Sequence, residues 1–193
     1  MPSLRQRNRL NAMRLTQRTA LAMFEAEGFE AVTVNQIAAE VGMAASTIYR
    51  HFDTKEAIVL WDEHDADMDA AYVREFTAKP PFAALRAVYA DELGPRYDDD
   101  LEFQLRRVQF IYRTEGLHAA AVEADYRDTQ ELTAALETVL SKKHRGSAVV
   151  LARAALAALD IAFDRWQAAG GIKPLGPFIH EAFDAFANLD ALR

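Results

Sequence analysis

The sequence TVNQIAAEVGMAASTIYRHFDTKEA, residues 33–57, carries the signals of two short helices, a tight turn between them and the start of a third helix. Thr33 and Gln36 form the S/T-x-x-E/Q pattern of a capping box, which predicts that the first helix begins at Thr33. Apolar residues then recur at helical spacing. Gly42 is expected to end this helix, because glycine tolerates a positive φ.

The second short helix is expected over Ala45–His51, with Ile48 and Phe52 facing inward. Its other side chains are small, polar, aromatic or basic, so they are expected on the outer face. Residues 53–56 then form another capping signature that opens the next helix. Two short helices joined by a tight turn indicate a helix-turn-helix, whose second helix would lie in the major groove of DNA.

This segment resembles the DNA-binding domain of the TetR family of one-component transcriptional regulators. The residues that carry the resemblance are Phe24, Gly28, Phe29, Thr33, Ile37, Ala38, Gly42, Met43, Tyr49, His51, Phe52, Lys55 and Glu56. It covers about the first 60 residues; beyond them only length and helical character agree with the family. The resemblance implies a homodimeric repressor that binds a palindromic operator and is released by a small molecule.

The predicted DNA-binding residues lie in a basic N-terminal arm, at helix starts and on the second helix of the motif. They are Arg5, Arg7, Thr33, Ala44, Ala45, Ser46, Thr47, Tyr49, Arg50, His51 and Lys55. Small residues at the start of that helix offer few hydrogen bonds to bases, although methyl groups can touch a thymine methyl. Ala44 replaces the serine that the family usually has at the helix cap, which predicts a marginal helix.

Several of these assignments have a structural alternative. Tyr49 contacts a phosphate in the family but could be a half-buried core aromatic. Arg50 could contact a guanine or a phosphate, or be solvated, and Lys55 could bind a phosphate or be solvated. Residues 1–8 are expected to be disordered without DNA, and the first helix is expected from Asn8 to Glu27. Arg5 and Arg7 could therefore contact DNA or belong to a frayed, solvated terminus.

The overall net charge of −7 is unusual for a DNA-binding protein, but the charge is unevenly distributed. Residues 1–56 hold 7 basic and 6 acidic residues, a net +1, and the remainder holds 15 and 23, a net −8. This asymmetry is expected when one domain meets phosphate and the other does not. Cysteine is absent, and no long apolar run or signal peptide is recognised, so a cytoplasmic protein without a membrane span is expected.

The predicted fold is all-α, with about nine helices in two domains: a helix-turn-helix head over residues 1–56 and a ligand-binding and dimerisation body over residues 57–193. The helices expected in the body lie at about Lys55–Thr77, Pro81–Leu93, Leu101–Thr114, Leu117–Ser141, Ser147–Ala169 and Phe178–Leu192. The last two are so apolar that pairing with their copies across a two-fold axis is expected.

The effector is expected to bind among the helices of the body. The candidates are aromatic residues with two arginines as polar anchors: Trp61, Phe76, Tyr89, Phe103, Arg107, Phe110, Arg113, Tyr126, Phe163 and Trp166. For each residue taken singly, an ordinary core or interface role is the preferred interpretation. Trp166 followed by Gly170-Gly171 resembles sensor domains that bind acyl-CoA or other long apolar ligands.

Catalysis is not expected, because the sequence contains no nucleophile elbow, P-loop, dinucleotide fingerprint or zinc-protease motif. No cofactor is predicted. The acidic stripe Asp62, Asp65 and Asp69 could in principle hold a divalent metal, but a solvated helix face is the preferred interpretation. The basic segment Lys142–Ser147 is likewise interpreted as a solvated loop, with anion binding as the alternative. The remaining alternative to a regulator is a helical small-molecule-binding or adaptor protein that does not read DNA.

Overall fold

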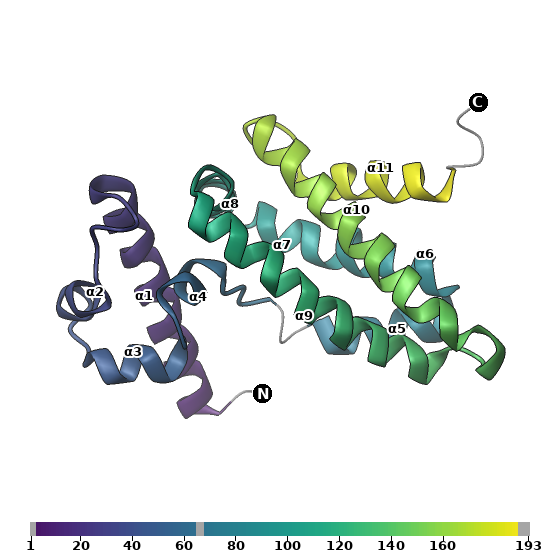
Figure 1. Ribbon diagram of the computed structural model, residues 1–193, viewed down its shortest axis with the longest axis horizontal. Coiled ribbons are helices and arrows are strands. Elements are labelled where there is room, and N and C mark those ends of the chain that lie inside the picture. Colours follow the sequence, from purple (N-terminus) through teal and green to yellow (C-terminus); the bar gives the residue numbers. More distant parts are fainter. Residues whose placement is uncertain (1–2, 65–67, 189–193) are drawn as a thin grey trace. The chain divides into compact units, whose positions relative to one another are not determined.

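The computed structural model describes residues 3–64 and 68–188, and within these ranges the chain is helical and has no strand (Figure 1). The α-helices in chain order are α1 (Leu4–Glu27), α2 (Val34–Glu40), α3 (Ala45–His51), α4 (Lys55–Leu60), α5 (Met68–Ala78), α6 (Pro81–Ala87), α7 (Gly94–Asp98), α8 (Leu101–Arg113), α9 (Glu115–Val139), α10 (Ala148–Ala168) and α11 (Leu175–Ala187). A π-helical segment, η2 (Val88–Leu93), joins α6 to α7, and a 3-10 segment, η3 (Lys142–Ser147), precedes α10. The all-α prediction is confirmed.

Contacts within the chain define two compact units. The first, called the head unit below, contains the residues up to Glu63 together with Phe110–Ala121. The second, called the body unit, contains His64–Gln109 and the residues from Val122 onward. Helices α8 and α9 each contribute residues to both units.

The first helix begins earlier than predicted, at Leu4 instead of Asn8. Ser3 caps it: the Ser3 N–H donates to Gln6 Oε1 at 2.7 Å, and the Gln6 N–H donates to Ser3 Oγ at 3.2 Å. This is a complete capping box, so the expectation of a disordered arm over residues 1–8 is wrong for the described part of that segment. Arg5 and Arg7 therefore lie on a helix.

The single helix predicted over Lys55–Thr77 is also wrong, because α4 ends at Leu60 and α5 begins at Met68. Trp61 adopts φ −55° and ψ 126°, which leaves the helical region. The side chain of Gln17 hydrogen-bonds the carbonyl groups at this helix end. A tertiary contact therefore accompanies a break that local sequence does not signal.

Two further boundaries differ from the prediction. The helix predicted over Pro81–Leu93 is followed without a break, because α7 begins at Gly94 directly after η2. Pro95 is tolerated there because the first residues of a helix need no N–H donor. The last helix starts at Leu175 instead of Phe178, and its expected end at Leu192 lies outside the described residues.

The head unit is built around the inner face of α1. Phe24 is 1% exposed, and its ring lies 4.9 Å from that of Phe29 and 6.2 Å from that of Phe110. Ile37 and Ile48 are completely buried and bring α2 and α3 into the same core. Burial of this kind stabilises small domains by about 1.5–3 kcal/mol per large apolar side chain.

The body unit is centred on the packing of α11 against α10 and η2. Leu175, Ile179 and Phe183 are completely buried along one face of α11. Aromatic rings continue this core, with Phe82 5.0 Å and Tyr89 6.1 Å from Phe183. The apolar face of α11 is thus covered within the body unit.

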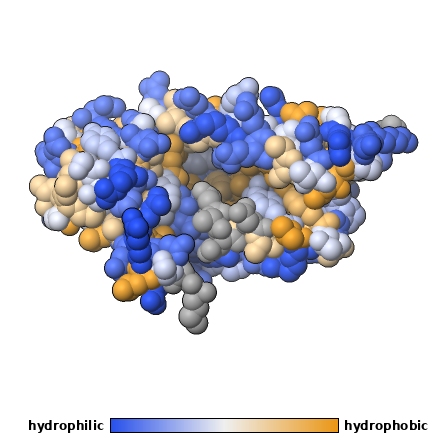
Figure 2. Space-filling view, turned by 90° about the horizontal axis from the view of Figure 1, so that it is seen from below, coloured by the Kyte–Doolittle hydropathy of each residue, from blue (hydrophilic) through white to orange (hydrophobic). Residues whose placement is uncertain are grey.

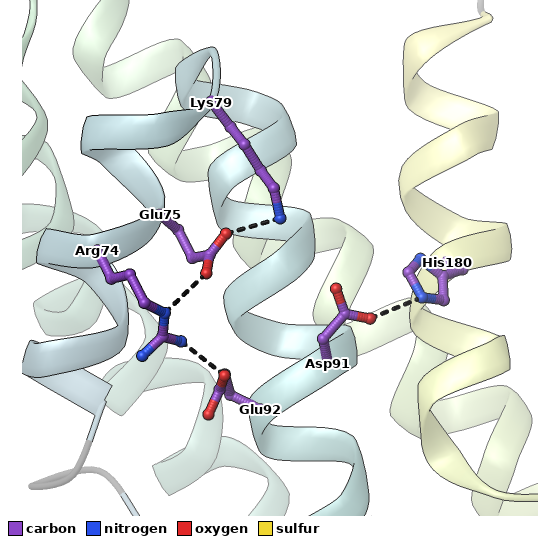
Figure 3. A network of polar contacts seen from close by, with 6 residues as sticks. All are labelled: Arg74, Glu75, Lys79, Asp91, Glu92 and His180. Atoms are coloured by element: carbon purple, nitrogen blue, oxygen red, sulfur yellow. Dashed lines mark hydrogen bonds and ion pairs between the residues drawn. The ribbon is translucent and has the colours of Figure 1, made fainter.

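Surface ion pairs connect α5 with η2 in the body unit, and His180 of α11 lies 3.2 Å from Asp91 of η2 (Figure 3). The Arg74 guanidinium donates to Glu75 Oε1 at 3.0 Å and to Glu92 Oε1 at 2.6 Å, while Lys79 Nζ lies 2.7 Å from Glu75 Oε2. The hydrogen bonds from Lys79 and Arg74 lower the pKa of Glu75. Exposed pairs of this kind contribute little individually to stability.

The segment Lys142–Ala168 is long and apolar enough to cross a membrane by length and composition, contrary to the expectation that the chain has no such segment. Core helices of water-soluble proteins pass the same test. Within it, α10 packs along α11 and carries exposed charges at Arg153, Asp160 and Arg165, which are costly inside a bilayer. The face shown in Figure 2 mixes hydrophilic and hydrophobic residues.

Candidate DNA-binding site

The turn between α2 and α3 has the geometry that the sequence predicts. The Thr33 N–H donates to Gln36 Oε1 at 2.8 Å and the Gln36 N–H donates to Thr33 Oγ1 at 3.3 Å, so the predicted capping box is present. Gly42 adopts φ +67°, and the Met43 N–H donates to the Ala38 carbonyl oxygen at 2.9 Å. These bonds close α2 and direct the chain into α3.

Helix α3 is anchored by its inner face. Ile48 is completely buried and Phe52, its C-cap, is 3% exposed. Among the predicted DNA-binding residues of this helix and its cap, Ala44, Ser46, Tyr49 and Arg50 are exposed, while Ala45, Thr47 and His51 are half-buried. The Tyr49 side chain, 51% exposed, is therefore not a core aromatic. Ala44 makes no side-chain cap.

Lys55 has structural partners that the sequence did not reveal. Its ammonium donates to the carbonyl oxygens of Phe29 at 2.7 Å and Val32 at 3.4 Å, and it lies 4.2 Å from the centre of the Phe29 ring. These contacts fix the connection between α1 and α2. An ammonium has three donors, so one remains available for another acceptor.

The early start of α1 changes the arrangement of the N-terminal arginines. Arg5 and Arg9 are four residues apart and share one helix face, whereas Arg7 points elsewhere. The positive charges of Arg9 and Arg50 both lower the pKa of His51 in α3. The sequence predicts that Arg9, like Arg5 and Arg7, reaches backbone phosphates or the minor groove from a basic arm; the Ser3–Gln6 capping box is the signal that places these residues on a helix instead.

Residues 18–60 match the family model described as bacterial regulatory proteins, tetR family. Residues 18–60 therefore form a TetR-family domain. The HTH-type transcriptional regulator TcmR of Streptomyces glaucescens is 28% identical over 151 residues, and the match covers 74% of this chain. The chain spans only 64% of the length of TcmR.

Two solved structures of transcriptional repressors share the fold. Thermus thermophilus FadR, a TetR-family transcriptional repressor in complex with lauroyl-CoA, has a TM-score of 0.52 at 19% identity, covering 91% of this chain and 93% of FadR. NalD, the secondary repressor of the MexAB-OprM multidrug efflux pump in Pseudomonas aeruginosa, has a TM-score of 0.54 at 16% identity, covering 90% and 92%. At these identities the likeness concerns the fold alone.

His51 gives this TetR-family head a specific electrostatic feature. Burial lowers the pKa of its imidazole below 6.5, and the charges of Arg9 and Arg50 lower it further. Its buried Nδ1 atom has no hydrogen-bond partner among the described residues. The neutral imidazole is therefore favoured in the free protein near neutral pH.

A lowered folded-state pKa predicts how stability depends on pH. Because the unfolded chain takes up the proton of His51 first, this contribution is complete above pH 6.5 and is lost as pH falls through the folded-state value. We expect the unfolding free energy of the wild type to fall more steeply than that of His51→Gln between about pH 7.5 and pH 5. Urea denaturation followed by circular dichroism measures both; His144→Gln, at an exposed position, is the control. Equal slopes would contradict the assignment.

Three predicted effector residues belong to the head unit. The Trp61 ring lies 5.8 Å from that of Phe52, and the Phe110 ring stacks on Phe24. The Arg113 guanidinium lies 3.6 Å from Glu25 and 5.0 Å from the centre of the Phe110 ring. These contacts give the three side chains a role in the packing of the head unit.

Other predicted effector residues gather around Tyr97 in the body unit. Arg107, 3% exposed, donates to the Tyr97 hydroxyl at 2.7 Å and to Gln104 Oε1 at 3.0 Å. Phe163 and Trp166 lie 5.1 Å and 6.0 Å from the Tyr97 ring. Tyr97 was missed in the sequence because it follows Pro95 and belongs to no periodic apolar stripe.

The remaining candidates do not join that cluster. Tyr89 and Phe76 both contact Tyr72: the Tyr72 and Tyr89 hydroxyls are 2.9 Å apart, and the Tyr72 and Phe76 rings are 5.9 Å apart. Phe103 is buried, whereas Tyr126 is 58% exposed on α9. The i, i+4 spacing of Tyr72 and Phe76 was the signal that could have identified Tyr72.

The structure adds nothing that favours a metal or anion site. Asp65 and the side chain of Asp69 lie outside what the structure describes, and the described residues contain no metal-binding group of three or more His, Cys, Asp or Glu. Residues 142–147 are all exposed. A shallow groove of about 480 Å³ lies on the outer side of α1, and none of the predicted effector residues line it.

Proposed function

We propose that the protein is a ligand-responsive, DNA-binding transcriptional repressor that acts in the cytoplasm as a homodimer. The observation that carries the proposal is the exposed outer face of α3, held from behind by buried Ile48 and Phe52. In a dimer, two such helices would enter successive major grooves about 34–36 Å apart and select a palindromic operator. The match of residues 18–60 to the TetR family supports this function.

The division of labour within the proposed site follows from side-chain chemistry. The residues from Ala44 to Thr47 would approach base edges, and Arg50 would hydrogen-bond a guanine or a phosphate. Tyr49 and the start of α2 at Thr33 would contact phosphates, since helix N-termini favour anions. Arg5 and Arg9, on one face of α1, would add phosphate contacts, and Arg7 would reach the DNA backbone from another face. A DNA phosphate near His51 would accept a hydrogen bond from the imidazole.

The effector is proposed to be a small apolar molecule bound in the domain formed by residues 57–193, without a cofactor or catalysis. The cluster of Tyr97, Phe163 and Trp166 supplies apolar surface, and Arg107 supplies a positive charge. The lauroyl-CoA held by FadR supports an acyl-chain-bearing effector as one candidate. The effector would bind more tightly to a conformation of the dimer that cannot bind DNA. It would thereby raise the population of that conformation and release the operator.

Dimerisation is proposed through α10 and α11. Val149, Val150 and Ile161 of α10 are 40%, 65% and 37% exposed, which is apolar surface that a second copy could cover. Light scattering coupled to size-exclusion chromatography tests this directly. A monomer at micromolar concentration would contradict a two-fold operator complex.

The test of the main proposal is a selection from a random pool of DNA duplexes, followed by titration of the selected duplex against salt. A regulator should enrich a palindrome and lose affinity steeply with salt, because each neutralised phosphate contributes a slope of about −0.9 in log K against log salt. Arg50→Ala should reduce the preference for the selected duplex, whereas Tyr49→Phe should weaken all duplexes alike. Mass spectrometry of co-purified small molecules would identify the effector class.

Lys55→Met separates the two roles of this lysine. Loss of the bonds to Phe29 and Val32 should lower the unfolding free energy of the head unit by about 1.5–3 kcal/mol. If the third donor binds a phosphate, the salt slope should also fall by about 0.9. Urea denaturation and the salt titration are measured on the same preparation. An unchanged slope with reduced stability would leave Lys55 a structural role only.

The second candidate function is a helical small-molecule-binding or adaptor protein whose head does not read DNA. The observation in its favour is Ala44, which leaves α3 without a side-chain cap. Such a protein would enrich no duplex in the selection but would still carry or bind an apolar ligand. The two functions are thus separated by a single experiment.

A further inference from the structure

Gln17 lies near the middle of α1, yet its side chain is only 5% exposed. Its Nε2 donates to the carbonyl oxygens of Val59 at 3.2 Å and Trp61 at 2.6 Å. Val59 belongs to the last turn of α4 and Trp61 is its C-cap. Carbonyl groups at the C-terminal end of an α-helix lack intrahelical partners, so Gln17 supplies a donor where the helix cannot.

The residues that follow α4 are fixed at two more points. The Trp61 ring meets the Phe52 ring edge to face, at 5.8 Å and 74°. Phe52 is the C-cap of α3 and its N–H donates to the Ile48 carbonyl oxygen at 2.8 Å. Glu63 forms an ion pair with Arg14, which lies one helical turn before Gln17 on the same face of α1.

We propose that Gln17 is a positioning residue for operator reading: it fixes the end of α4 to α1 and, through Trp61 and Phe52, sets the orientation of α3. The inference rests on the proposed function, since orientation of α3 matters only if α3 reads DNA. The chain passes from this segment into the body unit at His64.

The test compares two substitutions at Gln17 with a control at its neighbour. Gln17→Glu keeps the shape but turns an acceptor toward the two carbonyl oxygens, and Gln17→Met keeps the length without any donor. Thr16→Val is the control, because Thr16 is also completely buried and its hydroxyl donates at 2.9 Å to Ala12 within α1, away from α4. The DNA probes are the duplex selected by the wild type and a scrambled duplex of equal composition.

The decisive quantity is the ratio of affinities for the selected and the scrambled duplex, measured by fluorescence anisotropy at a temperature where all variants are folded. Loss of stability alone lowers both affinities equally and leaves the ratio unchanged. Misorientation of α3 weakens base contacts more than phosphate contacts, so both Gln17 variants should lower the ratio about fivefold or more. Thr16→Val should retain the wild-type ratio.

A second readout follows Trp61 directly. The chain contains two tryptophans, so in a Trp166→Phe background Trp61 is the only indole. Its emission should shift to longer wavelength in Gln17→Glu and not in Thr16→Val. A Gln17→Glu protein with the wild-type ratio overturns the inference, whatever its stability. A wild type that enriches no duplex overturns the proposed function itself, before any variant is made.

Discussion

Replacing Gly94 by alanine is expected to lower the unfolding free energy of the body unit by about 1–3 kcal/mol, the usual cost of overpacking. A Cβ atom at Gly94 would lie 3.0 Å from both Cα and N of Gly176, and one at Gly176 would lie 3.0 Å from the Ala90 carbonyl oxygen. These neighbours are backbone atoms, so α11 would have to move away from η2 and α7. The small gain in helix propensity of alanine over glycine does not offset that displacement.

Gly116→Ala is the matched control for this prediction. Gly116 lies in the first turn of α9, and a Cβ atom there would meet nothing within 4 Å. Replacing Gly116 by alanine should therefore raise the unfolding free energy by about 0.4–1 kcal/mol. Alanine restricts the conformations of the unfolded chain and introduces no strain in the folded one. Urea denaturation followed by circular dichroism compares the two variants. A loss of stability at both positions, or at neither, would contradict close packing at Gly94.

The local signals of this fold were available in the sequence. The capping box at Thr33 and Gln36, the stop at Gly42 and the inward positions of Ile48 and Phe52 all follow from rules that act within a few residues. The same capping rule applied to Ser3 and Gln6 would have placed the start of α1 correctly. The basic composition of residues 3–8 therefore does not indicate disorder where a capping box is present.

The end of α4 at Leu60 could not be predicted in the same way. Residues 55–60 continue into a sequence without glycine or proline, so local propensity favours a longer helix. The structure instead shows Gln17, 42 residues before Val59, bonded to the helix end. A contact at that sequence separation has no signature in a single sequence, because any polar residue of α1 could have served.

The residues of the candidate site divide in the same way, into those that local sequence signals predict and those whose partners are distant in the sequence. Residues of α3 were assigned from their spacing and lie on the expected side of the helix, as the exposure of Tyr49 illustrates. For Lys55 the sequence predicts either a phosphate contact or a solvated side chain, and its bonds to Phe29 and Val32 emerge only in three dimensions. Arg107 was named as an anchor without any indication of its partner Tyr97. Pairwise geometry was thus the missing information.

Trp166→Ala is expected to have the largest effect on stability of all the substitutions considered. The Trp166 side chain is completely buried, and its Nε1 donates to the Lys173 carbonyl oxygen at 3.1 Å. Truncation of such a residue removes the ring contacts with Tyr97 and Phe163, leaves a cavity and costs about 3–5 kcal/mol. Since domains are stable by only about 5–15 kcal/mol, a large part of the stability of the body unit would be lost.

This substitution also decides what Trp166 does, because the residue is both an effector candidate and a core residue. The measurement is urea denaturation of protein that mass spectrometry shows to be free of co-purified ligand, so an effector contact cannot contribute. Trp166→Phe, which keeps an aromatic ring, should cost clearly less than alanine. Tyr126→Ala, at an exposed aromatic of α9, should change stability by less than about 0.5 kcal/mol. If Trp166→Ala is equally mild, the side chain does not hold the core together, and a role in effector binding becomes the better explanation of its position.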